Sequence, residues 1–358
     1  METYLVGGAV RDQMLGLPVL EKDYVVVGAT ENEMRSAGYR SVGKDFPVFL
    51  HPETNEEYAL ARTEKKVGPG HQGFVCHSTP DVTLEEDLVR RDLTINAMAR
   101  NHDGGLIDPI GGQQDLAAKL LRHVSDAFTE DPLRILRVAR FKARFHHLGF
   151  TVEPGTLHLL NGMVSGGLLS ELTPERIHAE LNKALATNDP AEFFVCLEQI
   201  NGNQVLWPEI SSIGIELLRD SPSTDTETRF ALLLLDQQPS NISSLCRRLK
   251  CSTSRSEVTL LVREQHARWA DLDGQSAESI IDFFRQLDAI RKWARFTKFN
   301  AICEAVTGKD LANSWGALLE RVAAVKARDL ASDATGPQLG ERVREEQIRV
   351  VATFMDKR

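Results

Sequence analysis

The chain has 358 residues, with 51 acidic and 42 basic side chains that give a formal net charge of −9. This length exceeds one typical hydrophobic core, so we expect more than one domain. No apolar run is long enough to cross a bilayer, and no basic segment leads into a hydrophobic stretch at the N-terminus, so we expect no membrane span, no secretory signal and a cytoplasmic location. The five scattered cysteines predict neither a zinc site nor disulfides.

The first motif along the chain is a glycine turn followed by two acids. An apolar run predicts a strand that ends at Gly7-Gly8, and a short helix that carries Arg11 follows. Backbone N–H groups of the turn and the guanidinium can hold phosphate oxygens. A second strand is predicted at residues 23–27. Because side chains alternate along a strand, Glu21 and Asp23 are expected to point the same way and to share hard cations.

The run Gly7-Gly8-Ala9-Val10-Arg11-Asp12 followed by Glu21-Lys22-Asp23 resembles the nucleotidyltransferase head of the class II tRNA nucleotidyltransferases, the CCA-adding enzymes, and of their relatives the bacterial poly(A) polymerases. The resemblance implies that Glu21 and Asp23 bind a pair of Mg²⁺ ions, and that Gly8 and Arg11 orient the triphosphate. The family pattern is Asp-x-Asp, from which Glu21 departs by one methylene. Because Mg²⁺ requires near-ideal octahedral geometry, we expect the longer side chain to slow the chemistry without abolishing binding.

The rest of the head is expected to complete a small mixed sheet. A capping box at Thr30 opens a short helix, and residues 40–62 alternate apolar and polar side chains. Glu57 is a candidate third carboxylate near the metals by analogy with polymerase-like sites, and an ordinary exposed strand acid is an equal alternative. Residues 63–81 are rich in Gly and Pro without periodicity, which predicts a mobile loop. In the resembled family a flexible loop at this place is associated with the final A, and a passive loop is the alternative.

A second motif, Arg90-Arg91-Asp92, follows a helix that has a capping box at Thr83. The resemblance implies that Arg91 and Asp92 read the sugar hydroxyl and the triphosphate of the incoming ribonucleotide. An acid can accept a hydrogen bond from a 2′-OH, and an arginine forks onto phosphate. Asn96 is expected to support the motif from the same helix. Without the family context, a solvated charge cluster is the alternative interpretation.

A third motif, Glu130-Asp131-Pro132-Leu133-Arg134, begins a helix that Thr129 is expected to cap. At about 100° per residue this helix gathers four arginines in one sector, together with Leu133 and Phe141: Arg134, Arg137, Arg140 and Arg144. The resemblance implies that Asp131 and Arg134 pair with the Watson–Crick edge of CTP or ATP, and that Arg137 and Arg140 contact the nucleotide or its phosphates. C and A both carry an exocyclic amine that a carboxylate can bind, whereas G and U present a different edge. A surface arginine stripe without a base-reading role is the alternative.

The last part of the chain is expected to be helical. Glu175, Arg176 and Glu180 match the family's ERxxxE element, which is expected to brace the base-reading helix. Beyond about residue 210, helical segments alternate with Gly, Ser and Asp breaks. Relatives can carry a metal-dependent HD phosphohydrolase in this region, but Leu235-Asp236 stands where its His-Asp pair would be, so we expect no such activity. Four bases are candidate phosphate contacts, although scattered surface bases are the commoner explanation: Arg247, Arg248, Lys250 and Lys292.

The resemblance implies an α+β fold with a polymerase-β-like nucleotidyltransferase head at residues 1–125, a helical neck with the nucleotide-selecting motif at 126–210, and a tRNA-binding helical body and tail at 211–358. The implied reaction is template-independent addition of C, C and A to the 3′ end of tRNA from CTP and ATP, including repair of damaged ends. Mg²⁺ is the implied cofactor, and the protein is expected to be a monomer or a homodimer. The acidic net charge gives no global basic footprint, but clustered bases permit RNA binding. Two alternatives stay open: a poly(A) polymerase that uses ATP only, and a catalytically weakened RNA-binding relative.

Overall fold

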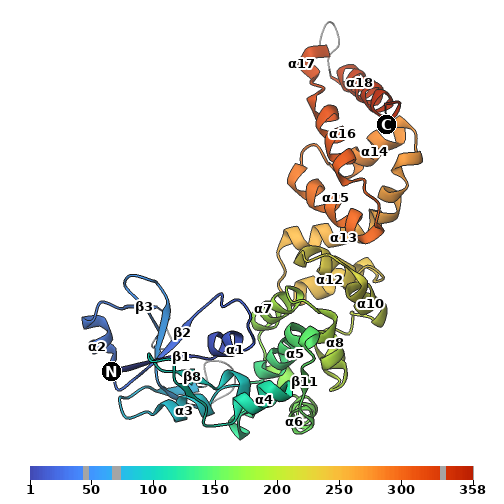
Figure 1. Cartoon of the computed structure of the whole chain (residues 1–358). Coiled ribbons are helices and arrows are strands. Elements are labelled where there is room, and N and C mark those ends of the chain that lie inside the picture. Colours follow the sequence, from blue (N-terminus) through green and yellow to red (C-terminus); the bar gives the residue numbers. More distant parts are fainter. Residues whose placement is uncertain (43–47, 67–73, 331–335, 358) are drawn as a thin grey trace. The chain divides into compact units, whose positions relative to one another are not determined.

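The computed structural model describes residues 1–42, 48–66, 74–330 and 336–357. The chain divides into two compact units, Met1–Leu206 and Trp207–Arg358 (Figure 1). No helix within the described ranges is both long and apolar enough to span a membrane. The first unit contains all the strands that the structure describes and the second contains helices, which confirms the α+β class. The domain ends expected at residues 125 and 210 stay predictions.

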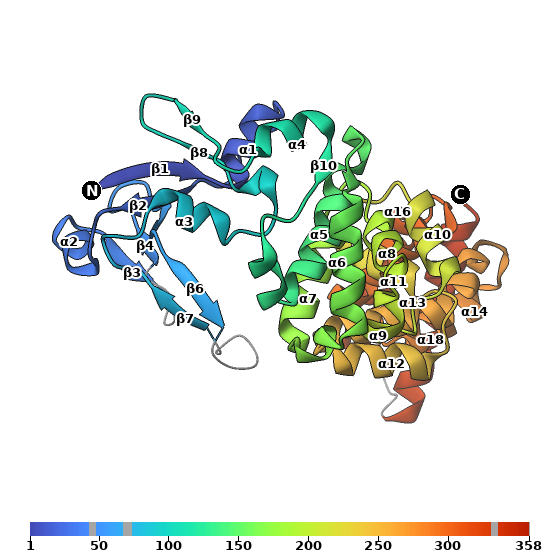
Figure 2. The same cartoon turned by 90° about the horizontal axis from the view of Figure 1, so that it is seen from below.

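The head is built on a mixed seven-stranded sheet with the order β3-β4-β5-β2-β1-β8-β9. Strand β2 pairs in parallel with β5, and the other neighbouring strands of this sheet are antiparallel. The strands, most of them visible in Figure 2, are β1 (Glu2–Val6), β2 (Asp23–Val27), β3 (Arg40–Val42), β4 (Val48–Leu50), β5 (Glu57–Leu60), β8 (Ala99–Arg100) and β9 (Leu106–Ile107).

Each face of this sheet carries its own apolar cluster. Val25 packs with Leu88 on one face, whereas Val26 packs with Met34 on the other. Successive side chains of β2 therefore alternate between the faces, and Asp23 shares the face of Val25. The head helices are α1 (Gly8–Met14), α2 (Glu31–Ser36), α3 (Leu84–Val89), the 3₁₀ turn η2 (Thr94–Asn96) and α4 (Gly112–Ala118).

The capping boxes expected at Thr30 and Thr83 are both confirmed, because each threonine accepts a backbone N–H and the glutamate three residues later bonds back to it. The expectation of a loop over residues 63–81 is wrong for residues 63–66 and 74–77, whereas residues 78–81 form neither helix nor strand, as expected. β6 (Thr63–Lys66) and β7 (Phe74–His77) pair there as an antiparallel hairpin. Residues 67–73, on which the rest of that expectation falls, lie outside the described residues.

Helix α5 (Leu133–Phe145) is the central element of the neck and packs against α7 and α8. Its apolar side, which includes Ile135 and Val138, is buried as expected. The cap expected from Thr129 is wrong, because its hydroxyl donates to the Asp126 carbonyl within a preceding 3₁₀ turn. Asp131 accepts the Leu133 N–H at 3.1 Å instead. The other neck elements are β10 (Leu120–Leu121), η3 (Asp126–Glu130), η4 (His146–Leu148), β11 (Thr151–Val152), α6 (Pro154–Ser165), η5 (Leu168–Glu171), α7 (Pro174–Leu185), α8 (Ala191–Glu198) and α9 (Gly202–Leu206).

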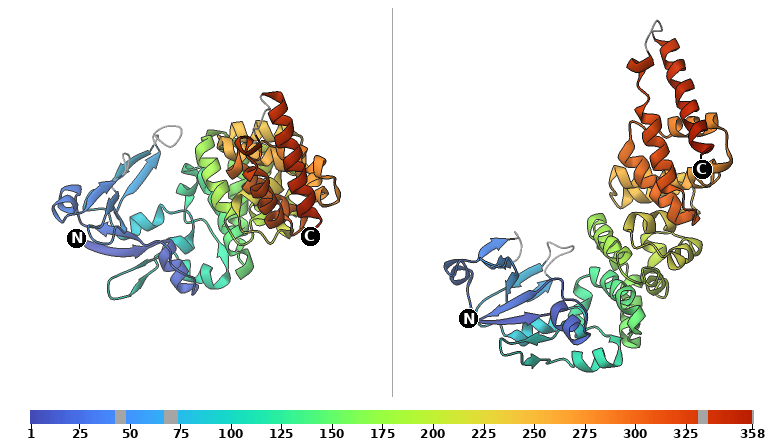
Figure 3. Two further views of the ribbon diagram at one scale, coloured as in Figure 1. Left: turned by 90° about the horizontal axis from the view of Figure 1, so that it is seen from above. Right: turned by 45° about the horizontal axis from the view of Figure 1, so that its top comes forward.

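The second unit, whose helices are drawn in yellow to red in Figure 3, has its own apolar core, in which Trp269, Phe283 and Trp315 are buried. Where a His-Asp pair was considered, Leu235 packs against this core and Asp236 accepts a hydrogen bond from the Ser211 hydroxyl at 2.7 Å. The helices are α10 (Ser212–Asp220), α11 (Thr226–Leu233), α12 (Pro239–Arg248), α13 (Thr253–Ala270), η6 (Leu272–Gly274), α14 (Ala277–Gln286), α15 (Trp293–Thr307), α16 (Ala312–Ala324), α17 (Ala327–Leu330) and α18 (Pro337–Met355).

Candidate active site

A cavity of about 540 Å³ lies in the first unit between the head sheet and helix α5, and we call it the nucleotide cavity. The structure brings into its lining all the expected site residues except Glu21: Gly8, Arg11, Asp23, Glu57, Arg91, Asp92, Asp131, Arg134, Arg137 and Arg140. These residues come from five separate stretches of the sequence. Their individual roles stay predictions.

Three acids lie where β2 and β5 begin. Asp23 and Glu57 are direct neighbours in the parallel register. Glu21 precedes β2, so strand alternation does not apply to it, yet it lines a hollow of about 380 Å³ together with the other two. Partial burial raises the pKa of Asp23, Arg91 opposes that shift and the charge of Glu21 adds to it. In the described parts of the chain no three His, Cys, Asp or Glu side chains lie close enough to hold a metal ion, so a cation here would draw further oxygens from a bound substrate.

Arg91 lies beside the glycine turn. Gly7 has a φ of +67°, and a Cβ on it would lie 2.8 Å from Arg91 Nη1, so glycine is what permits this approach. Arg91 Nη2 donates to the buried Asp87 at 3.1 Å, and Asp87 also pairs with Arg90 at 2.6 Å. The Arg91 Nε is buried and has no hydrogen-bond partner within the described chain. Arg91 as a residue lines the cavity, and a guanidinium there is a charged donor for an anionic ligand.

Arg11, which is expected to orient the triphosphate, is almost completely buried. Its side chain is 2% exposed and hydrogen-bonds to Asn96 and to Asp12. The guanidinium carbon lies 5.2 and 4.9 Å from the ring centroids of Phe141 and Phe145. Burial lowers the pKa of Arg11 to about 10, with the Asp12 charge opposing the shift, so the group stays cationic at neutral pH. Arg11 therefore joins α1 to α5, and its contact with a triphosphate stays a prediction.

Asp92 is the most fully bonded carboxylate of the cavity. Its Oδ1 accepts from the Leu93 N–H at 2.8 Å and from Asn96 at 2.9 Å, and its Oδ2 accepts from Arg137 at 2.7 and 2.6 Å. Burial acts to raise the pKa of Asp92, but the Arg137 charge and these hydrogen bonds outweigh it and hold the pKa well below its usual range. The expectation that Asn96 supports Asp92 from the same helix is wrong in its geometry, because α3 ends at Val89 and Asn96 lies in η2.

The expected base-reading pair is also engaged within the protein. Both carboxylate oxygens of Asp131 accept from Arg176 Nη2, at 3.1 and 2.9 Å. Arg134 donates to the carbonyls of Ala127 and Arg90 at 3.0 and 2.5 Å. Arg176 belongs to α7, so it holds the Asp131 carboxylate from a second helix, in keeping with the bracing expected of the ERxxxE element.

The arginines on the cavity side of α5 are each held by an acid or a carbonyl. Arg140 pairs with Glu180 at 2.6 Å, and Arg144 pairs with Asp12 at 2.8 Å. The ring of Phe141 lies beneath this row, 4.5 Å from the Arg140 guanidinium carbon. The apolar side chain that interrupts the arginine sector in the sequence is therefore the surface on which the arginines stack.

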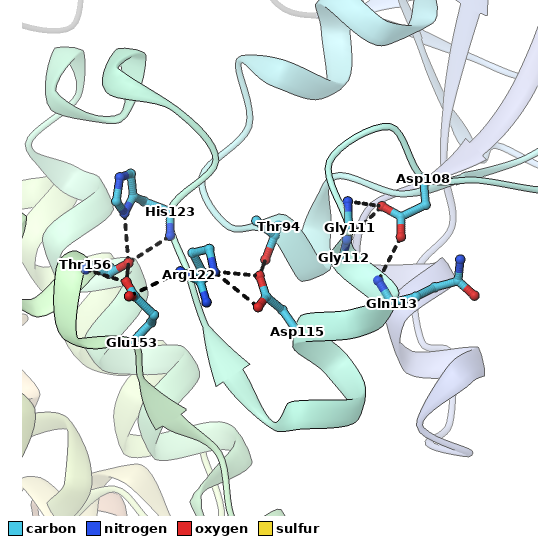
Figure 4. A network of polar contacts seen from close by, with 10 residues as sticks. All are labelled: Thr94, Asp108, Gly111, Gly112, Gln113, Asp115, Arg122, His123, Glu153 and Thr156. Carbon is cyan, nitrogen blue, oxygen red and sulfur yellow. Dashed lines mark hydrogen bonds and ion pairs between the residues drawn. The ribbon is translucent and has the colours of Figure 1, made fainter.

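A series of polar contacts joins the head to the neck (Figure 4). Thr94 donates to Asp115 at 2.7 Å, and Arg122 bonds both Asp115 and Glu153 at 3.1 Å. Glu153 in turn accepts the Thr156 N–H at the start of α6. The series of contacts begins in η2, the turn that also carries the cavity residue Asn96, so it links that turn to the start of α6.

Sequence reasoning misses Asp87 and Asp12, which hold cavity arginines in place. Asp87 had a usable signal, because it precedes Arg90 and Arg91 by three and four residues on a predicted helix. Asp12 bonds its neighbour Arg11 as well, but its pairing with Arg144 had no signal, because the two residues lie 132 positions apart in the sequence.

Comparison with known proteins matches this architecture. Residues 3–122 match the poly A polymerase head domain family, and residues 149–213 match the family described as the probable RNA and SrmB-binding site of polymerase A. The chain is 44% identical over 404 aligned residues to the multifunctional CCA protein of Thioalkalivibrio sulfidiphilus, covering 98% of each. It is 48% identical over 311 residues to the CCA-adding enzyme of Coxiella burnetii, covering 86% of this chain and 82% of that protein.

Two solved structures share the fold. The CCA-adding enzyme of Bacillus stearothermophilus in complex with CTP superposes with a TM-score of 0.73 at 24% identity, over 98% of this chain and 89% of that one. The Thermotoga maritima CCA-adding enzyme complexed with tRNA gives a TM-score of 0.69 at 21% identity, over 99% and 91%. With identities above 40% to curated relatives along nearly its whole length, the chain belongs to the family of CCA-adding enzymes.

Proposed function

We propose that this chain is a tRNA nucleotidyltransferase that adds C, C and A to the 3′ end of tRNA from CTP and ATP without a nucleic acid template, and releases pyrophosphate. One observation carries the proposal: Asp131 and Arg134, which can read a base edge, line the same cavity as Asp23 and Arg91. A cavity with acids at one end and a carboxylate–guanidinium pair along its wall suits a nucleotide whose base and triphosphate are both recognised. The curated relatives in this family carry names that state the same activity.

Different residues of the chain bind the phosphates, the base and the ribose of the nucleotide. Arg91 and the turn at Gly8 receive phosphate oxygens. Asp131 accepts from the exocyclic amine that C and A share, and Arg134 donates to the ring nitrogen or carbonyl beside it. Arg176 and the Leu133 N–H use only part of the acceptor capacity of Asp131, so its carboxylate can accept from a base with Arg176 still in place, whereas Arg134 must exchange its carbonyl partners for the base edge. Asp92 already accepts four hydrogen bonds, so a ribose 2′-OH competes for one of its oxygens.

A divalent cation suits the acid end of the cavity, and we propose Mg²⁺. Glu21, Asp23 and Glu57 offer hard oxygen donors, and Mg²⁺ commonly uses one or two carboxylates together with phosphate oxygens. Bound there, it would lower the pKa of the attacking 3′-hydroxyl and neutralise charge on the phosphates. Asp23, whose pKa is raised by its surroundings, gains most from such a counter-charge.

The RNA partner is proposed to be tRNA, with the helical unit supplying backbone contacts. RNA held by its backbone should dissociate more readily as salt concentration rises. A monomeric or homodimeric state and a cytoplasmic location complete the proposal.

The decisive test incubates the protein with three truncated tRNAs, ending before the first C, after C and after CC, and offers each of the four NTPs in turn. We expect CTP to extend the first two and ATP to extend the third, with pyrophosphate released in equal amounts. Extension of unrelated RNAs by ATP alone would identify a poly(A) polymerase. Comparable incorporation of G or U would contradict the roles of Asp131 and Arg134.

Substitutions at Glu21 test the remaining alternative, a catalytically weakened RNA-binding relative. If its length slows an otherwise intact site, Glu21→Asp should raise kcat several-fold and Glu21→Gln should abolish transfer, while CTP binding changes little. A wild-type protein that transfers nothing, together with a Glu21→Asp variant that does, would establish the catalytically weakened relative.

A further inference from the structure

A second cavity, of about 530 Å³, adjoins the nucleotide cavity within the first unit. The two share part of their lining: Gly8, Arg11, Asp23, Arg140 and Arg144. Glu21 faces the second cavity and not the first, whereas Asp131 and Arg134 line the first and not the second. Asp23 therefore stands at the boundary between the two cavities, with Glu57 in the lining of the first and Glu21 in that of the second, and the groups proposed to read the base belong to the first.

Phosphoryl transfer explains why a second space is needed. The attacking and leaving oxygens lie roughly in line on opposite sides of the phosphorus, so the attacking hydroxyl cannot enter from the side that holds the triphosphate. If the nucleotide fills the first cavity with its phosphates near Asp23, the attacking strand must reach these acids from elsewhere. The second cavity is lined by Glu21 and Asp23, so a strand in it would reach these acids.

The lining of the second cavity has the chemistry of a single-stranded RNA end. Lys183, in the last turn of α7, has a side chain that is 62% exposed, and its ammonium lies 3.7 Å from Glu180. Asn188 lies just beyond the same helix, with its amide 3.2 Å from the His147 ring. Leu20, adjacent to Glu21, is 88% exposed. An ammonium and an amide can bind a backbone phosphate, and an exposed apolar side chain can contact the face of a base or ribose.

Building on the proposed function, we propose that the second cavity holds the 3′-terminal nucleotide of the RNA being extended, and that Lys183 and Asn188 bind the phosphate on its 5′ side. Arg144 pairs with Asp12 through one nitrogen and lines both cavities, so it lies between the proposed sites of the RNA and the nucleotide. The assignment gives the two ligands separate polar partners. Changes at Lys183 should therefore act on RNA and leave the nucleotide unaffected.

The test measures A addition to tRNA ending in CC, and separately to a short single-stranded RNA ending in CC, with full-length protein. Lys183→Ala should raise KM for both RNAs about three- to five-fold, as expected for one solvent-exposed charge contact, and leave KM for ATP within about two-fold of wild type. Lys183→Arg should restore RNA binding, and Lys183→Ala/Asn188→Ala should raise KM further. The matched control is Arg35→Ala, an exposed base on α2 that lines neither cavity.

Salt dependence gives a second readout. The slope of log KM for the short RNA against log salt concentration should fall by about 0.7 in Lys183→Ala, the value for one phosphate contact on a single strand. An RNA KM and a salt slope that match those of Arg35→Ala would overturn the proposal, as would a rise in KM for ATP alone. Failure of the wild-type protein to extend CC-ending tRNA would instead overturn the proposed function, so the two outcomes are distinguishable.

Discussion

Asp92→Asn is the substitution for which the structure makes the sharpest prediction. The change is nearly isosteric, but it removes the charge that Arg137 faces at 2.6 Å. The Asn amide must place either its NH2 group or its uncharged carbonyl oxygen where a carboxylate oxygen of Asp92 now accepts from the Arg137 guanidinium. Asp92 has a side chain only 7% exposed, so water cannot substitute for the lost interaction on its side of the pair.

The expected magnitude follows from the burial of the two partners. Removing one member of a buried ion pair costs roughly 3–5 kcal/mol. The Arg137 side chain is 34% exposed and can be partly hydrated, which places the loss near the lower end, at about 3 kcal/mol. For a unit of this size, each kcal/mol shifts Tm by roughly 2–4 °C, so we expect a fall of about 10 °C in the transition of the first unit.

The pH dependence adds a direction. The pKa of Asp92 is depressed in the folded protein, so its stabilisation is fully present above the unfolded pKa of about 4 and is lost as pH falls through the folded value. The gap in Tm between wild type and Asp92→Asn should therefore be constant near neutrality and should narrow below about pH 4.

Calorimetric unfolding of full-length protein measures both effects. Glu31→Gln is the matched control, because Glu31 pairs with Arg35 at 3.3 Å on an exposed helix and its loss should cost less than about 1 kcal/mol. Asp92→Asn/Arg137→Met should recover at least half of the lost stability, because no uncompensated charge is left. Equal Tm values for Asp92→Asn and Glu31→Gln, or an additive double variant, would refute the reasoning.

Two further substitutions test the cavity wall. Gly7→Ala should raise KM for CTP about ten-fold, because the new Cβ would displace Arg91. Gly16 has the same φ of +67° but no heavy atom within 4 Å of an added Cβ, so Gly16→Ala should lower stability alone. Equal kinetics in the two variants would contradict this expectation. Arg176→Met should lower the preference for CTP over UTP about five-fold, because it releases the Asp131 carboxylate from its Arg176 partner. Single-nucleotide incorporation measures this preference, and an unchanged value would show that Arg176 is not needed to orient Asp131.

The sequence predicts the local features of the head and neck well, because their causes lie within a few residues. The Thr30 and Thr83 capping boxes and the buried side of α5 depend on spacing alone, and each is found where expected. The cap expected at Thr129 fails for an equally local reason, since Asp131 is closer to the helix start and accepts its first N–H. The second strand begins at Asp23 as predicted, so the strand alternation used to orient Glu21 relative to Asp23 does not extend to Glu21.

Pairings between distant segments are not accessible to this kind of reasoning. The sequence shows an arginine stripe but gives no means of choosing among acids for its partners. Asp12, Asp92 and Glu180 come from three different elements and are brought to α5 by the fold. Arg11 is predicted as a phosphate ligand from its motif, and only packing shows that Phe141 and Phe145 enclose it.

These distant pairings give α5 a role beyond that of a base-reading surface. Arg144 links the helix to α1 through Asp12, Arg137 links it to Asp92, and Arg140 links it to α7 through Glu180. A shift of α5 large enough to place Asp131 and Arg134 against a different base must therefore strain or break at least one of these charge pairs. If Asp131 and Arg134 read the base as proposed, the cost of accepting G or U falls on these ion pairs as well as on the base edge, and we expect the Asp92–Arg137 pair to contribute to nucleotide choice.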